Sequence, residues 1–218
     1  MARAVMKYLG VVVILNAIVV SAIIYDPAGV QGSGVIETRS FELTQFDHVT
    51  LEGVGTARIT KDKAPFLEMT TDENMFPLIS VEVEGGNLII KNEEEIRPSV
   101  FVMTIHSPNL RGISLTGNPT IEVPDISNNL FGISIKGNGS AEVSGEVDQL
   151  EVHVEGYGLV HAKELVAKEA RVDIVGNGEV EVHATIKLVA NCQGAGNVMY
   201  LGSPQLDGQC DGSVEPTE

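Results

Sequence analysis

A glycine recurs through the second half of the chain at a nearly fixed interval, and this repeat constrains the fold more than any other feature. The glycines are 18 to 20 residues apart, at Gly117, Gly137, Gly156, Gly176, Gly194 and Gly212. Apolar residues stand four and two positions before each of the first five and four and six positions after it, and polar residues mostly fill the positions between. This period of two predicts a strand on each side of a glycine turn. The self-similarity predicts a stack of repeated units.

The repeat predicts an all-β fold, a right-handed parallel β-helix (β-solenoid) with about 18–20 residues per coil. Stacked coils would place equivalent residues in ladders, and one internal ladder would contain Leu115, Ile135, Val154 and Ile174. Aromatic residues make up only 5% of the chain and Trp is absent, so the core must consist of aliphatic side chains. A string of antiparallel hairpins, closed into a barrel or sandwich, is the alternative. The fixed period with matched positions favours the β-helix.

The first half of the chain follows the repeat less well. Gly53 has the same flanking pattern, but 64 residues separate it from Gly117, which leaves room for about three units and for one or two degenerate copies. Within this gap, residues 81–90 read as a hairpin around Gly85 and Gly86. Residues 72–77 read as a loop or a short helical turn. We expect this region to form the N-terminal part of the same domain and to cap it.

The N-terminus carries an export pattern. Arg3 and Lys7 precede an apolar run from Tyr8 to Ile24, which predicts a signal peptide or membrane anchor helix over residues 1–25. Its 17 residues are at the lower limit for crossing a bilayer, so cleavage and retention both stay open. Residues 26–34 read as a linker, residues 35–214 as the β-helical domain, and residues 215–218 as an acidic tail. We expect an exported protein of the cell envelope that contacts the membrane through residues 1–25 if they are kept.

Several short motifs outside the glycine columns are shared with a known family. They are Arg39-Ser40-Phe41, Phe46-Asp47-His48-Val49, Thr71-Asp72-Glu73-Asn74, Gly86-Asn87-Leu88-Ile89-Ile90, and Gly194-Ala195-Gly196-Asn197-Val198 followed by Tyr200, Gly202 and Pro204. With the repeated Gly-x-Gly strands, they make residues 39–204 resemble the putative auto-transporter adhesin, head GIN domain family of bacterial envelope proteins. The resemblance implies an exported β-helical domain with a role in adhesion. The chain ends at Glu218, so we expect no C-terminal membrane translocator.

Charge and motif content narrow the function. The 14 basic and 30 acidic residues give a net charge of −16, which disfavours nucleic acid as a partner. The Gly-x-Gly turns lack the Lys-Ser/Thr pair of a phosphate loop, so we expect no nucleotide and no other cofactor. We expect a non-enzymatic scaffold or adhesin whose partner is an envelope or surface protein or glycan. A carbohydrate-binding or carbohydrate-cleaving β-helix is the main alternative, and a domain that senses an envelope partner from a membrane anchor is another.

Two outward columns contain residues with catalytic or metal-binding chemistry. Glu142, His161 and Glu181 occupy equivalent positions five residues after successive glycines, so they form a candidate stripe for a divalent metal. Metal sites need convergent ligands, whereas these would lie along a line. We therefore expect a solvated acidic stripe and no metal. The other column contains Ser114, Ser134, His153 and Asp173. On a convex ladder these side chains would be exposed side by side, so we expect no catalytic site.

The only two cysteines occupy one inward column. Cys192 and Cys210 each stand two positions before a repeat glycine and are one unit apart. Stacked strands are about 4.8 Å apart, within the Cα separation that a disulfide allows. We therefore predict a disulfide in an oxidising compartment, closing a loop of 18 residues and contributing about 3 kcal/mol. Two free, buried thiols are the alternative.

Overall fold

The computed structural model describes residues 29–62 and 64–217, and this part of the chain is almost entirely β-structure. The all-β prediction is confirmed. Thirteen strands form one large sheet with both parallel and antiparallel pairs, and β1 (Val30–Gln31) and β7 (Ile96–Arg97) form a separate parallel pair. The predicted N-terminal helix over residues 1–25 lies outside the described residues. Within the described ranges, no helix is long and apolar enough to cross a membrane.

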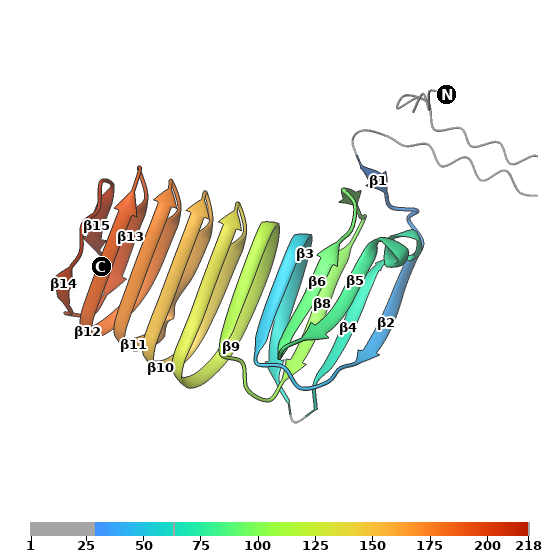
Figure 1. Cartoon of the computed structure of the whole chain (residues 1–218), viewed down its shortest axis with the longest axis horizontal. Helices are drawn as coiled ribbons and strands as arrows, with labels where there is room; N and C mark the ends of the chain where they lie inside the picture. The colour runs from blue at the N-terminus through green and yellow to red at the C-terminus, as the bar shows by residue number, and fades with distance from the viewer. Residues whose placement is uncertain (1–28, 63, 218) are drawn as a thin grey trace, which may run out of the picture.

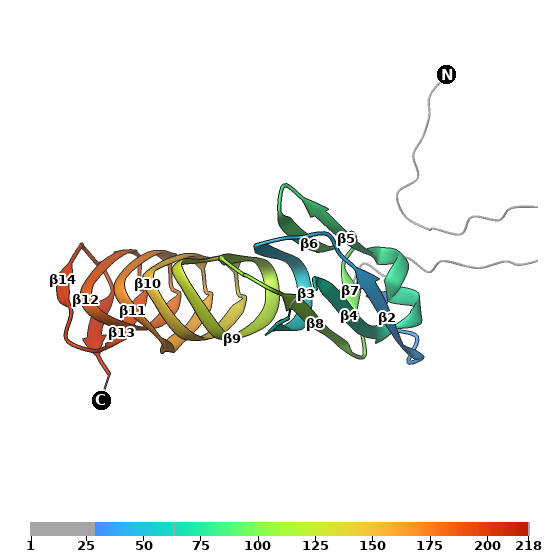
Figure 2. The same cartoon turned by 90° about the horizontal axis from the view of Figure 1, so that it is seen from below.

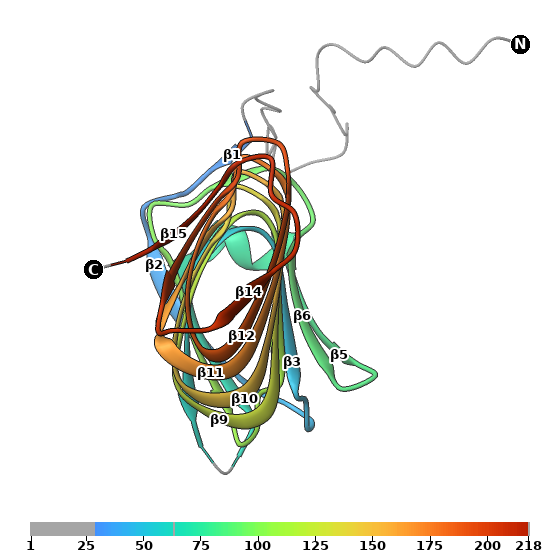
Figure 3. The ribbon, with the colours of Figure 1, turned by 90° about the vertical axis from the view of Figure 1, so that its left-hand side faces the viewer.

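The C-terminal half consists of successive turns of chain that pair in parallel (Figures 1 and 3). We call this half the stack. Its strands are β9 (Gly112–Gly137), β10 (Ser140–Gly156), β11 (Leu159–Gly176), β12 (Glu179–Gln193), β13 (Asn197–Leu201), β14 (Gln205–Asp207) and β15 (Ser213–Pro216). β9 continues past one whole turn, because the N–H of Asn138, just after its end, donates to the carbonyl of Gly117 at 2.8 Å. The repeat units therefore correspond to turns of the stack.

The predicted internal ladder is present. Val154 pairs with Ile135 on one side and with Ile174 on the other, and Ile174 pairs with Cys192. These residues and Leu115 are at most 3% exposed. The parallel pairing excludes the hairpin alternative for the stack, since a Gly-x-Gly turn there connects parts of the same turn rather than antiparallel neighbours. The right-handed sense of the coil stays a prediction.

The repeat glycines are required by backbone conformation as well as by space. Gly156 and Gly176 have φ of +110° and +122°, where residues with a side chain are strained. A Cβ on Gly176 would lie 2.6 Å from the carbonyl oxygen of Gly156, in the neighbouring turn. The glycine column therefore lets adjacent turns approach closely along one edge of the stack.

The N-terminal half is arranged differently from a simple continuation of the repeat. Its elements are β2 (Ile36–Glu42), β3 (His48–Lys61), β4 (Phe66–Asp72), the 3-10 helix η1 (Glu73–Leu78), β5 (Ile79–Glu84), β6 (Asn87–Asn92) and β8 (Phe101–Ser107). β3 pairs directly with β9, with Gly53 opposite Gly117. On its other side, β3 pairs in parallel with β6 and β8. One degenerate turn, residues 87–107, therefore lies beyond β3 rather than between β3 and β9 (Figure 1).

The parallel arrangement does not extend over the whole predicted domain, residues 35–214. β2 pairs with β4, and β4 with β8, in antiparallel fashion. β5 and β6 form the predicted hairpin around Gly85 and Gly86, and η1 provides the predicted helical turn. The two-residue glycine turn forces an antiparallel pair, because its strands are adjacent in the chain. These elements make up the N-terminal end of the molecule (Figure 2).

Residues at both ends of the predicted β-helical domain pair with the rest of the fold. Part of the predicted linker, residues 26–34, is held in place: Val30 and Gln31 pair with β7, and the N–H of Gly34 donates to the buried carboxylate of Asp72 at 2.7 Å. The predicted acidic tail, residues 215–218, begins within β15, where Glu215 pairs with Met199. Free edges of the fold offer backbone partners to each segment.

Candidate functional site

One outward surface of the stack collects the polar residues of the strands that precede the repeat glycines. We call it the histidine face and define it by His48, Ser114, Ser134, His153, Arg171 and Asp173. Ser134, His153 and Asp173 are neighbours in register on β9, β10 and β11. Gly132, on the same face, has open space where a Cβ would be. The missing side chain helps to form an open hollow of about 300 Å³ that is lined by residues of this face.

Hydrogen bonds on the histidine face run between neighbours rather than to a common point. His48 Nε2 and Ser114 Oγ are 2.9 Å apart, and His153 Nε2 lies 3.3 Å from Glu155 Oε1. The guanidinium of Arg171 donates to both carboxylate oxygens of Asp173, at 2.7 and 3.0 Å. Ser114, His153 and Asp173 of the predicted outward column thus have separate partners. This arrangement suits a recognition surface better than a proton relay.

Two groups on this face have shifted pKa values. Burial lowers the pKa of His48, and the carboxylate of Asp47 only partly offsets this effect. Burial alone would raise the pKa of Asp173, but hydrogen bonds from Asn191 and Arg171 outweigh it and hold the pKa below its usual value. His48 is therefore neutral and Asp173 ionised near neutral pH, which leaves the face with hydroxyl, imidazole and ion-pair groups.

The candidate metal stripe lies on another side of the stack. Glu142 pairs in register with His161, and His161 with Glu181, as the repeat predicts. His161 Nδ1 contacts Glu181 Oε2 at 2.7 Å, while Glu122, the next residue in the column, forms an ion pair with Arg58. No group of three or more His, Cys, Asp or Glu side chains is placed to hold a metal ion in the described part of the chain. The column consists of pairwise contacts along a line.

At the C-terminal end of the stack, Cys192 and Cys210 are joined by a disulfide with a Cα separation of 4.1 Å. Their backbones also form an isolated parallel bridge. The bond links β12 to the segment between β14 and β15, whose residues Gln209 and Asp211 also form backbone hydrogen bonds with Cys192. The geometry fits the one-unit offset of the two cysteines in the repeat.

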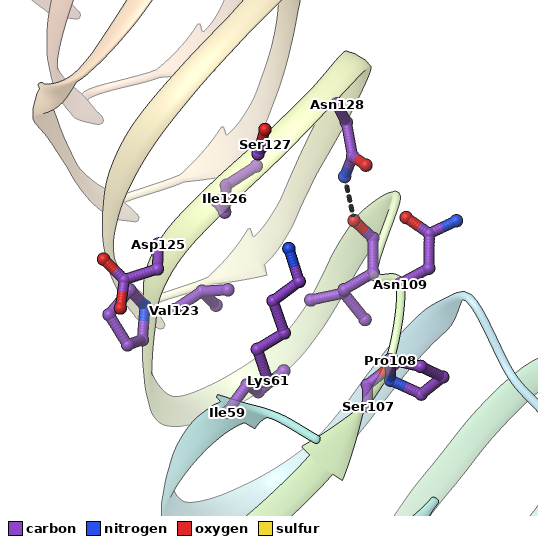
Figure 4. Close-up of a pocket in the computed structure, with 12 residues that line it drawn as sticks. Ile59, Lys61, Ser107, Pro108, Asn109, Val123, Asp125, Ile126, Ser127 and Asn128 are labelled. Carbon is purple, nitrogen blue, oxygen red and sulfur yellow. Dashed lines mark hydrogen bonds between the residues drawn. The ribbon is translucent and has the colours of Figure 1, made fainter. Parts of the chain in front are cut away.

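A small cavity that the repeat pattern gave no reason to expect lies where β3 leaves the stack (Figure 4). It is lined by the end of β3, by residues 107–110 and by the corner of β9 at residues 123–128. Asp125 in this corner has φ of +57°, a strained value for a residue with a side chain. The Oγ of Ser107 is buried and has no hydrogen-bond partner. The sequence signal was the break in the repeat after Lys61, but it could not reveal an unpaired hydroxyl.

Comparison with known families fits this architecture. Residues 45–204 match the family described as "Putative auto-transporter adhesin, head GIN domain". The chain belongs to this family. The predicted resemblance is thus confirmed over most of the chain. No curated protein matches the sequence.

Several solved structures have the same fold. One is described as a putative adhesin from Bacteroides fragilis, and it is 22% identical to this chain with a TM-score of 0.71. The match covers 87% of this chain and 100% of the neighbour's chain. Two others have TM-scores of 0.53, each matching 87% of this chain and 99% of the neighbour. They are a putative lipid binding protein from Parabacteroides distasonis, 24% identical, and a putative adhesin from Parabacteroides merdae, 18% identical. Neither the family nor these neighbours are described as enzymes.

Proposed function

We propose that this chain is a non-enzymatic, right-handed parallel β-helix of the bacterial cell envelope that acts as an adhesin or surface scaffold. Membership of the head GIN domain family supports a place at the cell surface. The parallel turns support a β-solenoid, and the strong preference of parallel crossovers supports its right-handed sense. Residues 1–25 would act as the export signal or membrane anchor.

The observation that carries the proposal is the histidine face. Its polar groups repeat once per turn, and the contacts His48–Ser114, His153–Glu155 and Arg171–Asp173 join neighbours instead of converging on one atom. An enzyme needs nucleophile, base and orienting group within hydrogen-bond reach of each other. An extended row of paired polar groups fits an extended ligand, such as a segment of a surface protein or a glycan.

The test is adhesion by the full-length protein in its bacterial host. We expect the protein in the envelope fraction, accessible to added protease on intact cells, and able to bind one component of an array of matrix proteins and glycans. Arg171→Ala should weaken this binding because it removes the guanidinium and the Arg171–Asp173 ion pair from the histidine face. Lys168→Ala is the matched control, since it removes an exposed ion pair with Asp148 of similar length elsewhere on the stack.

Equal loss in both variants, or localisation of the full-length chain to the cytosol, would contradict the proposal. Turnover of a polysaccharide that disappears in His153→Ala or His161→Ala would contradict its non-enzymatic part.

A second candidate, binding of carbohydrate, is favoured by the glycine edge of the stack. Tyr157 is 63% exposed there, and the equivalent positions of the two adjacent turns hold Asn138 and Asn177. An exposed aromatic ring beside side-chain amides can stack on a sugar ring and bind its hydroxyl groups. Tyr157→Ala should then abolish glycan binding, while Leu159→Ala, which shortens an exposed apolar side chain nearby, should leave it intact. Glycan binding that survives Tyr157→Ala would refute this candidate.

A further inference from the structure

The cavity beside Lys61 has a structural cause. After Lys61 the chain leaves the stack toward β4, so β3 does not complete its turn. The connection from β8 to β9, residues 108–111, crosses the space where the rest of that turn would lie. Asn128 of β9 fastens this connection by donating from its side-chain amide to the carbonyl oxygen of Leu110. A cavity of about 40 Å³ remains between the connection and the corner of β9, enough for a few atoms of a ligand or for ordered water.

Ser107 supplies an unused polar group at this cavity. The residue is 3% exposed, and its Oγ has no hydrogen-bond partner in the described structure. A buried hydroxyl without a partner costs free energy, so such groups are rare in folded proteins. Thr71, another buried hydroxyl residue of the N-terminal half, is paired by contrast, because its Oγ1 donates to the carbonyl of Val100 at 2.8 Å. Ser107 therefore marks a place where something outside the described residues completes the hydrogen bonding.

Lys61 supplies an unused positive charge at the same place. Among the basic residues that the structure describes, only Lys61, Arg97 and Lys163 form no ion pair with a carboxylate. Figure 4 shows the Lys61 side chain extending from β3 into the space beside the corner of β9, with the carboxylate of Asp125 turned away from it. In a chain with a net charge of −16, an ammonium group left without an acid at a cavity is suited to an anion from outside.

We propose that this cavity binds a carboxylate group, with the ammonium of Lys61 and the hydroxyl of Ser107 as its donors. One unpaired lysine balances one negative charge. The net negative charge of the protein and the nearby Asp125 disfavour a doubly charged phosphate. Ile59, Val123 and Ile126 line the cavity and suit the short apolar part of such a ligand. The site is separate from the histidine face and does not depend on the proposed adhesive role.

The test is an NMR titration of the full-length protein in a neutral detergent. The probes are sodium acetate, a galacturonic acid trimer as a carboxylate carried by a glycan, inorganic phosphate, and sodium chloride at matched ionic strength. We expect both carboxylates to shift the amide signals of Ser107, Leu110 and Asn128 with saturation, and phosphate and chloride not to do so. Tighter binding of the trimer would identify a glycan as the source of the carboxylate, and tighter binding of acetate a free acid.

Lys61→Met and Ser107→Ala should each weaken acetate binding by about tenfold, the loss expected for one charge-assisted hydrogen bond. Ser107→Ala should fold normally, because it removes an unpaired hydroxyl rather than a contact. Lys163→Met is the matched control, as it removes another lysine without an ion pair, and should leave the affinity within about twofold of the parent protein. Saturation by phosphate alone, no carboxylate-dependent shift, or equal loss in Lys163→Met would each overturn the proposal.

Discussion

The glycine edge of the stack leads to a sharp prediction about stability. Gly176→Ala places a Cβ on a residue with φ of +122° and 2.6 Å from the carbonyl oxygen of Gly156. The strained conformation alone costs about 1–3 kcal/mol. The carbonyl cannot easily move away, because it belongs to the backbone of the neighbouring turn, so we expect a total loss of about 2–4 kcal/mol.

Gly132→Ala is the matched control within the same stack. No atom lies within 4 Å of the Cβ that it would add, and the glycine has no positive φ of the kind that strains a side chain. Alanine restricts the unfolded chain more than glycine does, so this variant should be as stable as the parent or more stable by about 0.4–1 kcal/mol.

Urea unfolding followed by far-UV circular dichroism measures both effects. A loss of 2–4 kcal/mol corresponds to a midpoint lower by about 1–2 M urea at a typical slope of about 2 kcal/mol/M. The reasoning is refuted if Gly176→Ala unfolds at the midpoint of the parent, or if Gly132→Ala is destabilised as much as Gly176→Ala.

Three further predictions concern other parts of the fold. Protein purified from the envelope should have no reactive thiol when denatured without reductant, and replacing Cys192 and Cys210 by serine should lower the free energy of unfolding by about 3 kcal/mol. Because the pKa of His48 is lowered from 6.5 by burial, the unfolded chain binds the proton more readily. Stability should therefore fall as the pH drops below about 6.5, and His48→Asn should flatten this dependence in urea midpoints. Asp72→Asn turns an acceptor of the Gly34 N–H into a potential donor, so hydrogen exchange at Gly34 should accelerate.

Each of these has an outcome that contradicts it. Two free thiols per chain would exclude the disulfide. A urea midpoint of the parent protein that does not change across pH 6.5 would mean that His48 does not resist protonation in the folded state. Unchanged protection of Gly34 in Asp72→Asn would mean that β1 and its pairing with β7, rather than the buried carboxylate, hold the segment that leads to the N-terminus.

The regular half of this fold follows from the sequence because each turn repeats the same local pattern. Ile135, Val154 and Ile174 could be assigned to one ladder from their offsets to glycine alone, and the cysteine pair extended it. The order of strands in the first half could not be predicted in this way. The residues around Gly53 do not indicate which strand pairs with β3. The strand could belong to the unit that follows directly in the sequence, but the structure shows β9, which begins more than fifty residues later. The choice depends on long-range packing, which periodicity does not encode.

The same limit applies to the candidate sites. The outward columns of the histidine face and of Glu142, His161 and Glu181 followed from the period, because register fixes which residues are neighbours. The individual partners, such as His48 with Ser114, depend on side-chain conformations. The cavity at Ser107 depends on an irregular connection for which the repeat has no equivalent.

The position of β3 also affects how the protein can fold as it emerges from the ribosome or the export channel. All three parallel partners of β3 come later in the chain: β6 and β8 begin at Asn87 and Phe101, and β9 begins at Gly112. The side of β3 that pairs with β9 therefore stays open until more than fifty further residues have appeared, whereas each later turn can pair with one that is already complete. Non-local pairing of this kind slows folding and prolongs the exposure of apolar, aggregation-prone segments. The emerging chain should thus depend most on chaperones before Gly137 has appeared, and least afterwards.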